Sequence, residues 1–197
     1  MNNSCVFTVC VNDYHPEIAS KTIPAMEAYA KKLDADFQVI KNRKYTDWPA
    51  TYEKVQLYEL GKDYDCCILL DCDVYITPDM YDVRQIVPEN AVGVWMVYDP
   101  SITVKEDNYL KLDGSDTILS TNFVVTRKEQ HNLWTPLDMS WEEAKVHLKR
   151  YFVVDEYCVG RNMKRFNYAV AGLCLPGACN NLFYHMNITS GDSYTLV

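Results

Sequence analysis

Residues 64–74 read Tyr-Asp-Cys-Cys-Ile-Leu-Leu-Asp-Cys-Asp-Val, an apolar run that ends in two aspartates. The continuous apolar stretch Cys66–Leu70 is typical of a strand that is buried on both faces of a sheet. Asp71 and Asp73 follow it directly. Ligands of open parallel sheets collect beyond the carboxyl ends of the strands. This segment therefore predicts two carboxylates at the ligand-binding edge of a parallel sheet.

The Asp-x-Asp spacing indicates a metal site. Residues i and i+2 of an extended chain share a face, so Asp71 and Asp73 are expected on the same side. Two close carboxylates repel each other unless a cation lies beside them. Oxygen ligands with open positions suit Mg²⁺ or Mn²⁺, completed by phosphate oxygens. The alternative is an ordinary turn, because Asp is common at strand ends. The apolar residues on both sides favour the metal site.

The rest of the chain alternates between strand and helix patterns. This order predicts an α/β fold, with a mostly parallel central sheet and helices on both faces. We expect one domain over 1–197, since no repeat or linker interrupts the chain. Residues 100–120 are polar and aperiodic, so a long loop is expected there. Strands are expected at 5–11, 37–40, 66–70, 91–97, 121–126 and 169–173, and helices at 17–33, 51–61, 140–151 and 155–166.

Composition excludes several classes of protein. A net charge of −8 argues against a general nucleic-acid binder, which needs an excess of Lys and Arg. No apolar run is long enough to span a membrane, and the first residues lack the pattern of a signal peptide. The eight cysteines include no CxxC pair, and most of those in the first half lie in apolar runs. A reduced cytoplasmic protein is expected, in the host cytoplasm if the chain is viral.

The segment at 64–74 also resembles the corresponding segment of GT-A glycosyltransferases, particularly the retaining enzymes of glycosyltransferase family 8 and their short bacterial and large-DNA-virus members. The likeness continues in order along almost the whole chain. The other segments that carry it are Val11-Asn12-Asp13-Tyr14, Thr51-Tyr52-Glu53-Lys54, Asn122-Phe123-Val124-Val125, Val153-Val154-Asp155-Glu156 and Phe183-Tyr184-His185.

The resemblance implies an enzyme that moves a sugar from a nucleotide-sugar donor, expected to be a UDP-sugar, to a hydroxyl of a carbohydrate acceptor with retention. It implies Mn²⁺ or Mg²⁺ on Asp71, Asp73 and His185. Asp155 and Glu156 then open the helix at the reaction centre. The donor is expected to contact Val11, Asn12, Asp13, Tyr14, Lys54, Asp71, Cys72, Asp99 and Asn122. Among these, Tyr14 stacks on the base and Lys54 reaches the diphosphate-sugar.

Simpler roles remain open for several of these residues. Lys54 also suits a solvated helix face, and His185 lies among apolar residues where a core histidine is common. Acidic residues such as Asp155 and Glu156 favour the first turn of any helix. The chain also departs from the family pattern. No Lys follows His185, and Glu156 replaces the commoner Gln.

Two other functions also fit parts of the sequence. A haloacid-dehalogenase-type phosphatase would use Asp71 as its nucleophile, but its Asp-x-Asp strand normally opens the fold, whereas a βαβ-like segment precedes Asp71 here. The second alternative is a non-catalytic nucleotide-sugar-binding module that has kept the metal site.

Overall fold

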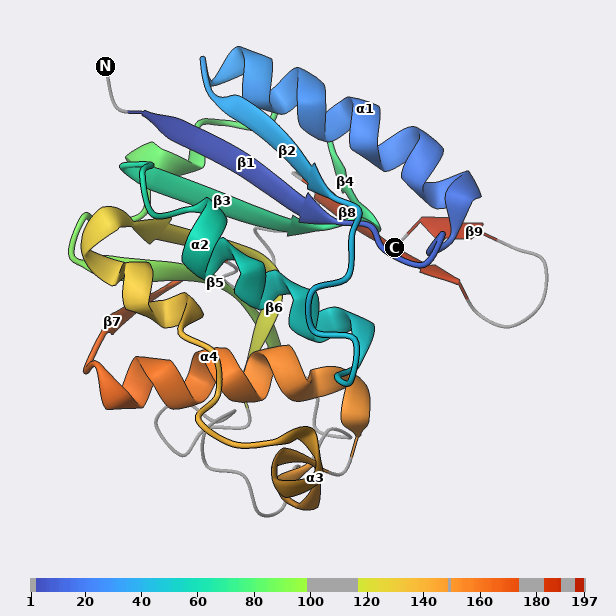
Figure 1. Cartoon of the computed structure of the whole chain (residues 1–197). Coiled ribbons are helices and arrows are strands. Elements are labelled where there is room, and N and C mark those ends of the chain that lie inside the picture. The colour runs from blue at the N-terminus through green and yellow to red at the C-terminus, as the bar shows by residue number, and fades with distance from the viewer. Residues whose placement is uncertain (1–2, 99–116, 149, 174–182, 189–193, 197) are drawn as a thin grey trace.

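The computed structural model describes residues 3–98, 117–148, 150–173, 183–188 and 194–196. Its centre is a six-stranded sheet in the order β2-β1-β3-β6-β5-β7 (Figure 1). Strands β1, β2, β3, β5 and β7 run in one direction and β6 runs against them. The predicted mostly parallel α/β sheet is therefore confirmed. The strands are β1 Ser4–Val9, β2 Asp36–Ile40, β3 Cys66–Asp71, β5 Ala91–Tyr98, β6 Thr117–Arg127 and β7 Ala169–Gly172.

Alternate residues of the buried strands pack on opposite faces of the sheet. In β3, Ile68 and Leu70 pack into the same apolar cluster as Met26 and Ala30 of α1 (Pro16–Lys32). Leu69, between them, packs with the opposite cluster, to which α4 (Val154–Arg165) contributes. The period of two in a strand produces this division. Helices thus cover both faces of the sheet, as expected (Figure 1).

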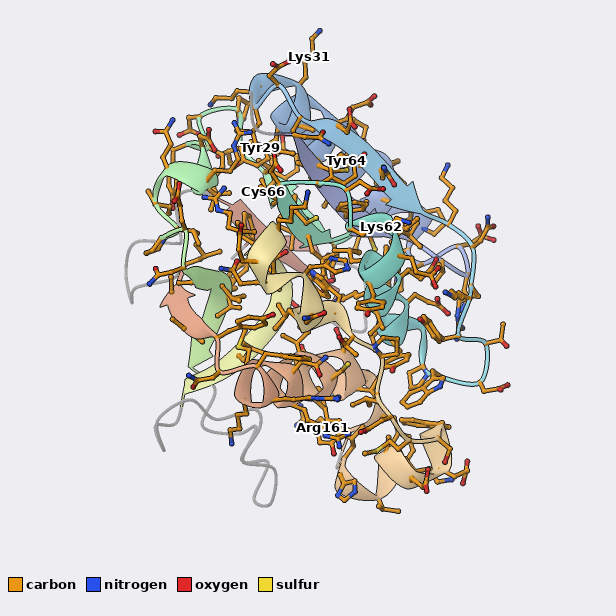
Figure 2. The ribbon with its side chains drawn as sticks, turned by 60° about the vertical axis from the view of Figure 1, so that its left-hand side comes forward. Tyr29, Lys31, Lys62, Tyr64, Cys66 and Arg161 are labelled. Carbon is orange, nitrogen blue, oxygen red and sulfur yellow. The ribbon has the colours of Figure 1, made fainter. Side chains whose placement is uncertain are left out.

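The first helix separates its faces as its sequence predicts. Tyr29 is buried, and its hydroxyl donates to the carbonyl oxygen of Tyr81 at 3.0 Å. Two residues further along, Lys31 is exposed and extends away from the protein (Figure 2). Pro24 lies inside this helix without ending it, so the helix spans nearly the predicted range. Among the residues described, none of the helices combines the length and the apolar character that a membrane span requires.

A second, antiparallel sheet lies beside the Asp-x-Asp turn. Its strands are β4 Val74–Ile76, β8 Phe183–Ile188 and β9 Tyr194–Leu196, in the order β4-β8-β9. Strand β4 begins directly after Asp73, so the two sheets meet at this turn. The sequence interpretation included none of these three strands.

Three local predictions were wrong. The expected helix at 51–61 is a 3₁₀ helix, η1 (Ala50–Gln56), followed by a single α-turn, α2 (Leu57–Leu60). Tyr58 and Leu60 of α2 are exposed. The expected helix at 140–151 is short. Its capping box is present, but α3 (Trp141–Ala144) gives way to η4 (Lys145–His147) and then η5 (Tyr151–Val153). Strand β6 starts at Thr117, inside the loop predicted at 100–120, and the rest of that predicted loop lies outside the described residues. The remaining 3₁₀ helices are η2 Val83–Gln85 and η3 Lys128–Trp134.

Candidate active site

A cleft opens at the carboxyl ends of β1 and β3. These strands pair in parallel, with Val9 opposite Asp71, so the segments that follow them leave the sheet side by side. The cleft has a volume of about 120 Å³. Its lining comes from the first strand and its loop, from η1 and from the Asp-x-Asp turn: Val9, Val11, Tyr14, Ala50, Thr51, Lys54, Asp71, Cys72 and Asp73. Several of the predicted donor-binding residues thus surround one cavity.

The Asp-x-Asp turn is held from behind by helix α1. The hydroxyl of Thr22, a buried residue in the middle of that helix, contacts the carbonyl oxygen of Cys72. Cys72 itself is buried, while Asp71 and Asp73 on either side of it line the cleft. The hydroxyl of Tyr14 approaches Oδ2 of Asp73 at 3.5 Å. Burial, and then the charge of Asp73, raise the pKa of Tyr14 to about 12.

The loop after β1 has an unusual backbone. Asn12, Asp13 and His15 have φ angles of 57°, 49° and 39°, in the left-handed region that side chains other than glycine rarely adopt. Asn and Asp tolerate this region best, because their short polar side chains bond locally. Such backbone often marks a ligand-binding segment. The ring of Tyr14, between these residues, is 45 % exposed at the cleft.

Lys54 is the centre of a buried ionic cluster. Its Nζ lies 2.6 Å from Oδ1 of Asp71, 2.7 Å from Oδ2 of Asp155 and 2.9 Å from Oγ1 of Thr121. The Lys54 and Asp155 side chains are 5 % and 2 % exposed. Burial works against the charge of Lys54, but attraction by Asp155 and Asp71 outweighs it and raises its pKa above the ordinary value. The alternative of a solvated lysine is therefore wrong.

A second buried acid fixes η1 so that Lys54 reaches this position. Glu53, fully buried, accepts hydrogen bonds from Nε of Arg43 at 2.7 Å and from the backbone N–H groups of Lys44 and Tyr45, each at 2.9 Å. Arg43 also donates to the carbonyl oxygens of Tyr45 and Trp48. The loop before η1 is thus bound to the residue that precedes Lys54 in the chain.

Asp155 and Glu156 stand in the first turn of α4, where the helix dipole favours negative charge. Burial is the main cause that raises the pKa of Asp71 to about 6. The ammonium of Lys54 lowers this pKa, and the carboxylates of Asp73 and Asp155 raise it. Burial, and then the Asp155 carboxylate, raise the pKa of Glu156 well above its ordinary value. The acidic side chains that act on the ammonium of Lys54 are thus Asp155, Asp71 and Glu156.

The other predicted residues stand as follows. Asn122 directly precedes Phe123 in β6, and Phe123 pairs with Leu70, the residue before Asp71. The backbone of His185 pairs with Val74, directly after Asp73, but its side chain lies outside the described part of the protein. Asp99 lies outside the described residues altogether. Among the side chains that the structure describes, no group of three His, Cys, Asp or Glu is placed to hold a metal ion.

Solved structures with a similar fold are glycosyltransferases. A glycosyltransferase involved in glycosylation of the major capsid of PBCV-1 is 16 % identical, with a TM-score of 0.60, over 95 % of this chain and 94 % of that one. The galactosyltransferase LgtC, in complex with donor and acceptor sugar analogs, is 14 % identical, with a TM-score of 0.54, over 85 % and 73 % of the two chains.

The chain has the GT-A fold. A third similar structure, a Drosophila β1,4-galactosyltransferase 7 mutant with manganese, UDP-Gal and xylobiose, is 12 % identical, with a TM-score of 0.51, over 94 % of this chain and 71 % of that one. No protein-family model and no curated protein sequence matches the chain. The relationship is therefore one of three-dimensional structure.

Sequence reasoning missed three residues that build the site. Thr121 joins Lys54 to Asp155, Thr22 holds the Asp-x-Asp turn, and Arg43 neutralises Glu53. Each contact joins segments far apart in the chain or lies in an aperiodic loop. One signal was available: Thr22 is a polar residue beside the apolar stripe of a predicted amphipathic helix.

Proposed function

We propose that the chain is a divalent-metal-dependent glycosyltransferase of the family 8 type, built on a single domain. It moves a sugar from a UDP-sugar to a hydroxyl of a carbohydrate acceptor, with retention of anomeric configuration. The observation that carries this proposal is the convergence of two acidic pairs. Lys54 brings Asp155, beside Glu156 on α4, to Asp71, beside Asp73 at the edge of the donor cleft.

The side chains present suit a bound Mn²⁺ or Mg²⁺. The cleft offers hard carboxylate oxygens from Asp71 and Asp73, the ligand type that these divalent cations prefer. Asp73 and Asp71 would hold the metal, and we propose His185 as a third ligand. A metal bound there would act as a Lewis acid for the departing nucleoside diphosphate. The manganese and UDP-Gal in one structurally similar enzyme support the same class of ligands here.

The remaining residues have separate roles in this proposal. Val11 to Asp13 offer backbone and polar groups to the uracil, and the exposed ring of Tyr14 stacks on it. Cys72 lines the floor of the cleft, and Asn122 and Asp99 approach the sugar. As the anomeric carbon gains oxocarbenium character, Asp155 or Glu156 stabilises the positive charge or orients the acceptor hydroxyl.

The two alternatives receive less support. A phosphatase with Asp71 as nucleophile receives no support from the fold likeness, which points to glycosyltransferases. A binding module without turnover would have no need for the buried acids of α4.

A thermal-shift screen of nucleotide sugars, with and without Mn²⁺, tests the proposal. Because a ligand that binds only the native state raises its stability by mass action, the correct donor should raise Tm only when the metal is present. NMR of the product formed with that donor then reports anomeric configuration. A screen in which no nucleotide sugar changes Tm would contradict the proposed function.

A further inference from the structure

All three hydrogens of the Lys54 ammonium have an acceptor inside the protein. The acceptors are Oγ1 of Thr121 at 2.9 Å, Oδ2 of Asp155 at 2.7 Å and Oδ1 of Asp71 at 2.6 Å. A lysine ammonium has three donors and no more. Lys54 therefore has no hydrogen left for a phosphate oxygen unless it gives up one of these bonds, each to a buried or half-buried partner.

The hydroxyl of Thr121 bridges Lys54 and Asp155. It accepts from Lys54 and donates to Oδ2 of Asp155 at 2.6 Å. Thr121 is fully buried and lies where the pairing of β6 with β5 changes register: Val94 is opposite Val124, whereas Trp95 is opposite Ser120. Such bulges re-aim side chains and are common beside active sites. The bulge thus contains the residue, Thr121, that contacts Asp155.

Both bonds of Thr121 and Lys54 to Asp155 end on Oδ2. The other oxygen, Oδ1, is buried and has no hydrogen-bond partner among the described residues. An unsatisfied buried carboxylate oxygen is costly, and a catalytic role is one of the explanations for such a group. The cluster holds one oxygen of Asp155 and leaves the other for a donor such as a sugar hydroxyl.

We propose, on the basis of the proposed function, that Lys54 and Thr121 are positioning residues and that Lys54 does not bind the diphosphate of the donor. They join β3, η1, β6 and α4 through one buried cluster and hold Asp155 against Asp71. Without the cation these two carboxylates would repel each other, and the first turn of α4 would move away from the Asp-x-Asp edge. This role differs from the donor contact that the family resemblance implies for Lys54.

The first test replaces Thr121 without changing the shape of its side chain. Thr121→Val removes the hydroxyl, so kcat should fall about tenfold to a hundredfold while KM for the donor stays within about threefold, because a small misplacement of a reacting group affects the transition state. Thr121→Ser keeps the hydroxyl and should restore most of kcat. Thr8→Val is the matched control, since Thr8 is fully buried and its hydroxyl has no partner among the described residues.

Two outcomes of this test would overturn the proposal. In one, Thr121→Val has the same kcat as Thr8→Val, which would make the hydroxyl irrelevant to the reaction. In the other, KM for the donor rises while kcat is unchanged, which would place the cluster in donor binding.

The second test does not depend on turnover. In ¹⁵N-labelled wild-type protein, the Lys54 ammonium should give a signal protected from exchange with water, and Thr121→Val should reduce that protection. The signal should stay protected at saturating UDP and Mg²⁺, with no ¹⁵N–³¹P coupling. A coupling to phosphorus would show that Lys54 donates to the diphosphate and would overturn the proposal.

The two proposals fail in different ways. If UDP does not bind and no sugar is transferred, the proposed function is wrong. The positioning role of Lys54 and Thr121 is then tested only by the exchange of the Lys54 ammonium hydrogens with water. Reduced protection in Thr121→Val supports this role, and unchanged protection refutes it.

Discussion

Nζ of Lys54 lies 2.6 Å from a carboxylate oxygen of Asp71 and 2.7 Å from one of Asp155. One cation thereby joins the strand that ends in the Asp-x-Asp turn to the helix that begins with the second acidic pair. Because Lys54 and Asp155 are buried, the energy of this contact is little screened by water. The geometry of the candidate site depends on this contact, and the predictions below examine the groups around it.

Asp73→Asn should abolish transfer and leave the fold intact. The side chain lines the cleft, so the substitution removes a proposed metal ligand but little packing. The measurements are transfer rate and Tm, with the exposed Asp63→Asn as the matched control. A near-normal rate in Asp73→Asn would remove this carboxylate from the mechanism, and loss of folding would show that it is structural.

Removal of the metal should weaken binding of UDP. Apart from Lys54, no lysine or arginine lines the described cleft, so a cation is needed to balance the diphosphate. Calorimetric titration of UDP in Mn²⁺ and in EDTA measures the difference, expected to be at least about tenfold from the strength of charge-assisted contacts. Equal affinity under both conditions would exclude a metal from donor binding.

Asp155→Ala should spare Mn²⁺–UDP affinity and reduce transfer by at least about a hundredfold, the scale of losing one well-placed electrostatic or acid–base group. The variant should also be less stable, because it leaves the buried Lys54 with one fewer partner. A phosphatase would behave differently: its late acidic pair holds the metal. Collapse of metal affinity in the variant, together with phosphate release by the wild type, would favour that alternative.

Glu53→Gln should destabilise the protein by about 3–5 kcal/mol, because it leaves the guanidinium of Arg43 half-buried without its counter-charge. Glu59→Gln is a matched control in the same segment. Its side chain is 64 % exposed in a surface pair with Lys44, so the expected change is at most about 1 kcal/mol. Urea unfolding measures both. Equal effects would show that the Arg43–Glu53 pair does not hold the loop before η1.

Thr22→Val should loosen the Asp-x-Asp turn, because the carbonyl oxygen of Cys72 loses the hydroxyl that contacts it. We expect a loss of about 1–3 kcal/mol in the free energy of unfolding, the cost of an unsatisfied buried acceptor, together with weaker metal affinity. Thr8→Val should be neutral or stabilising, since that hydroxyl has no partner among the described residues. Unchanged metal affinity in Thr22→Val would show that α1 does not fix the turn.

The sequence by itself determined which segments form the strands of the central sheet and where the acids stand along the chain. Cys66–Leu70 is continuously apolar because both faces of its strand are covered, and the Asp pair comes where that strand leaves the core. The helix expected at 155–166 is likewise present as α4. These are local signals, carried by residues close together in the chain. The sequence-based prediction was least accurate at η1 and after α3, where the chain forms 3₁₀ turns in place of the expected regular α-helix.

Tertiary structure alone decided how the acids meet. The sequence gives no indication that the reversed strand β6 lies between β3 and β5, or that the bulge beside Trp95 carries Thr121 to Asp155. Nor does it distinguish a surface lysine from one in a buried cluster. That difference depends on burial and on partners from distant segments, which desolvate Lys54 and at the same time compensate its charge. Periodicity reports which face of an element is buried, whereas a polar contact depends on the three-dimensional path of the whole chain.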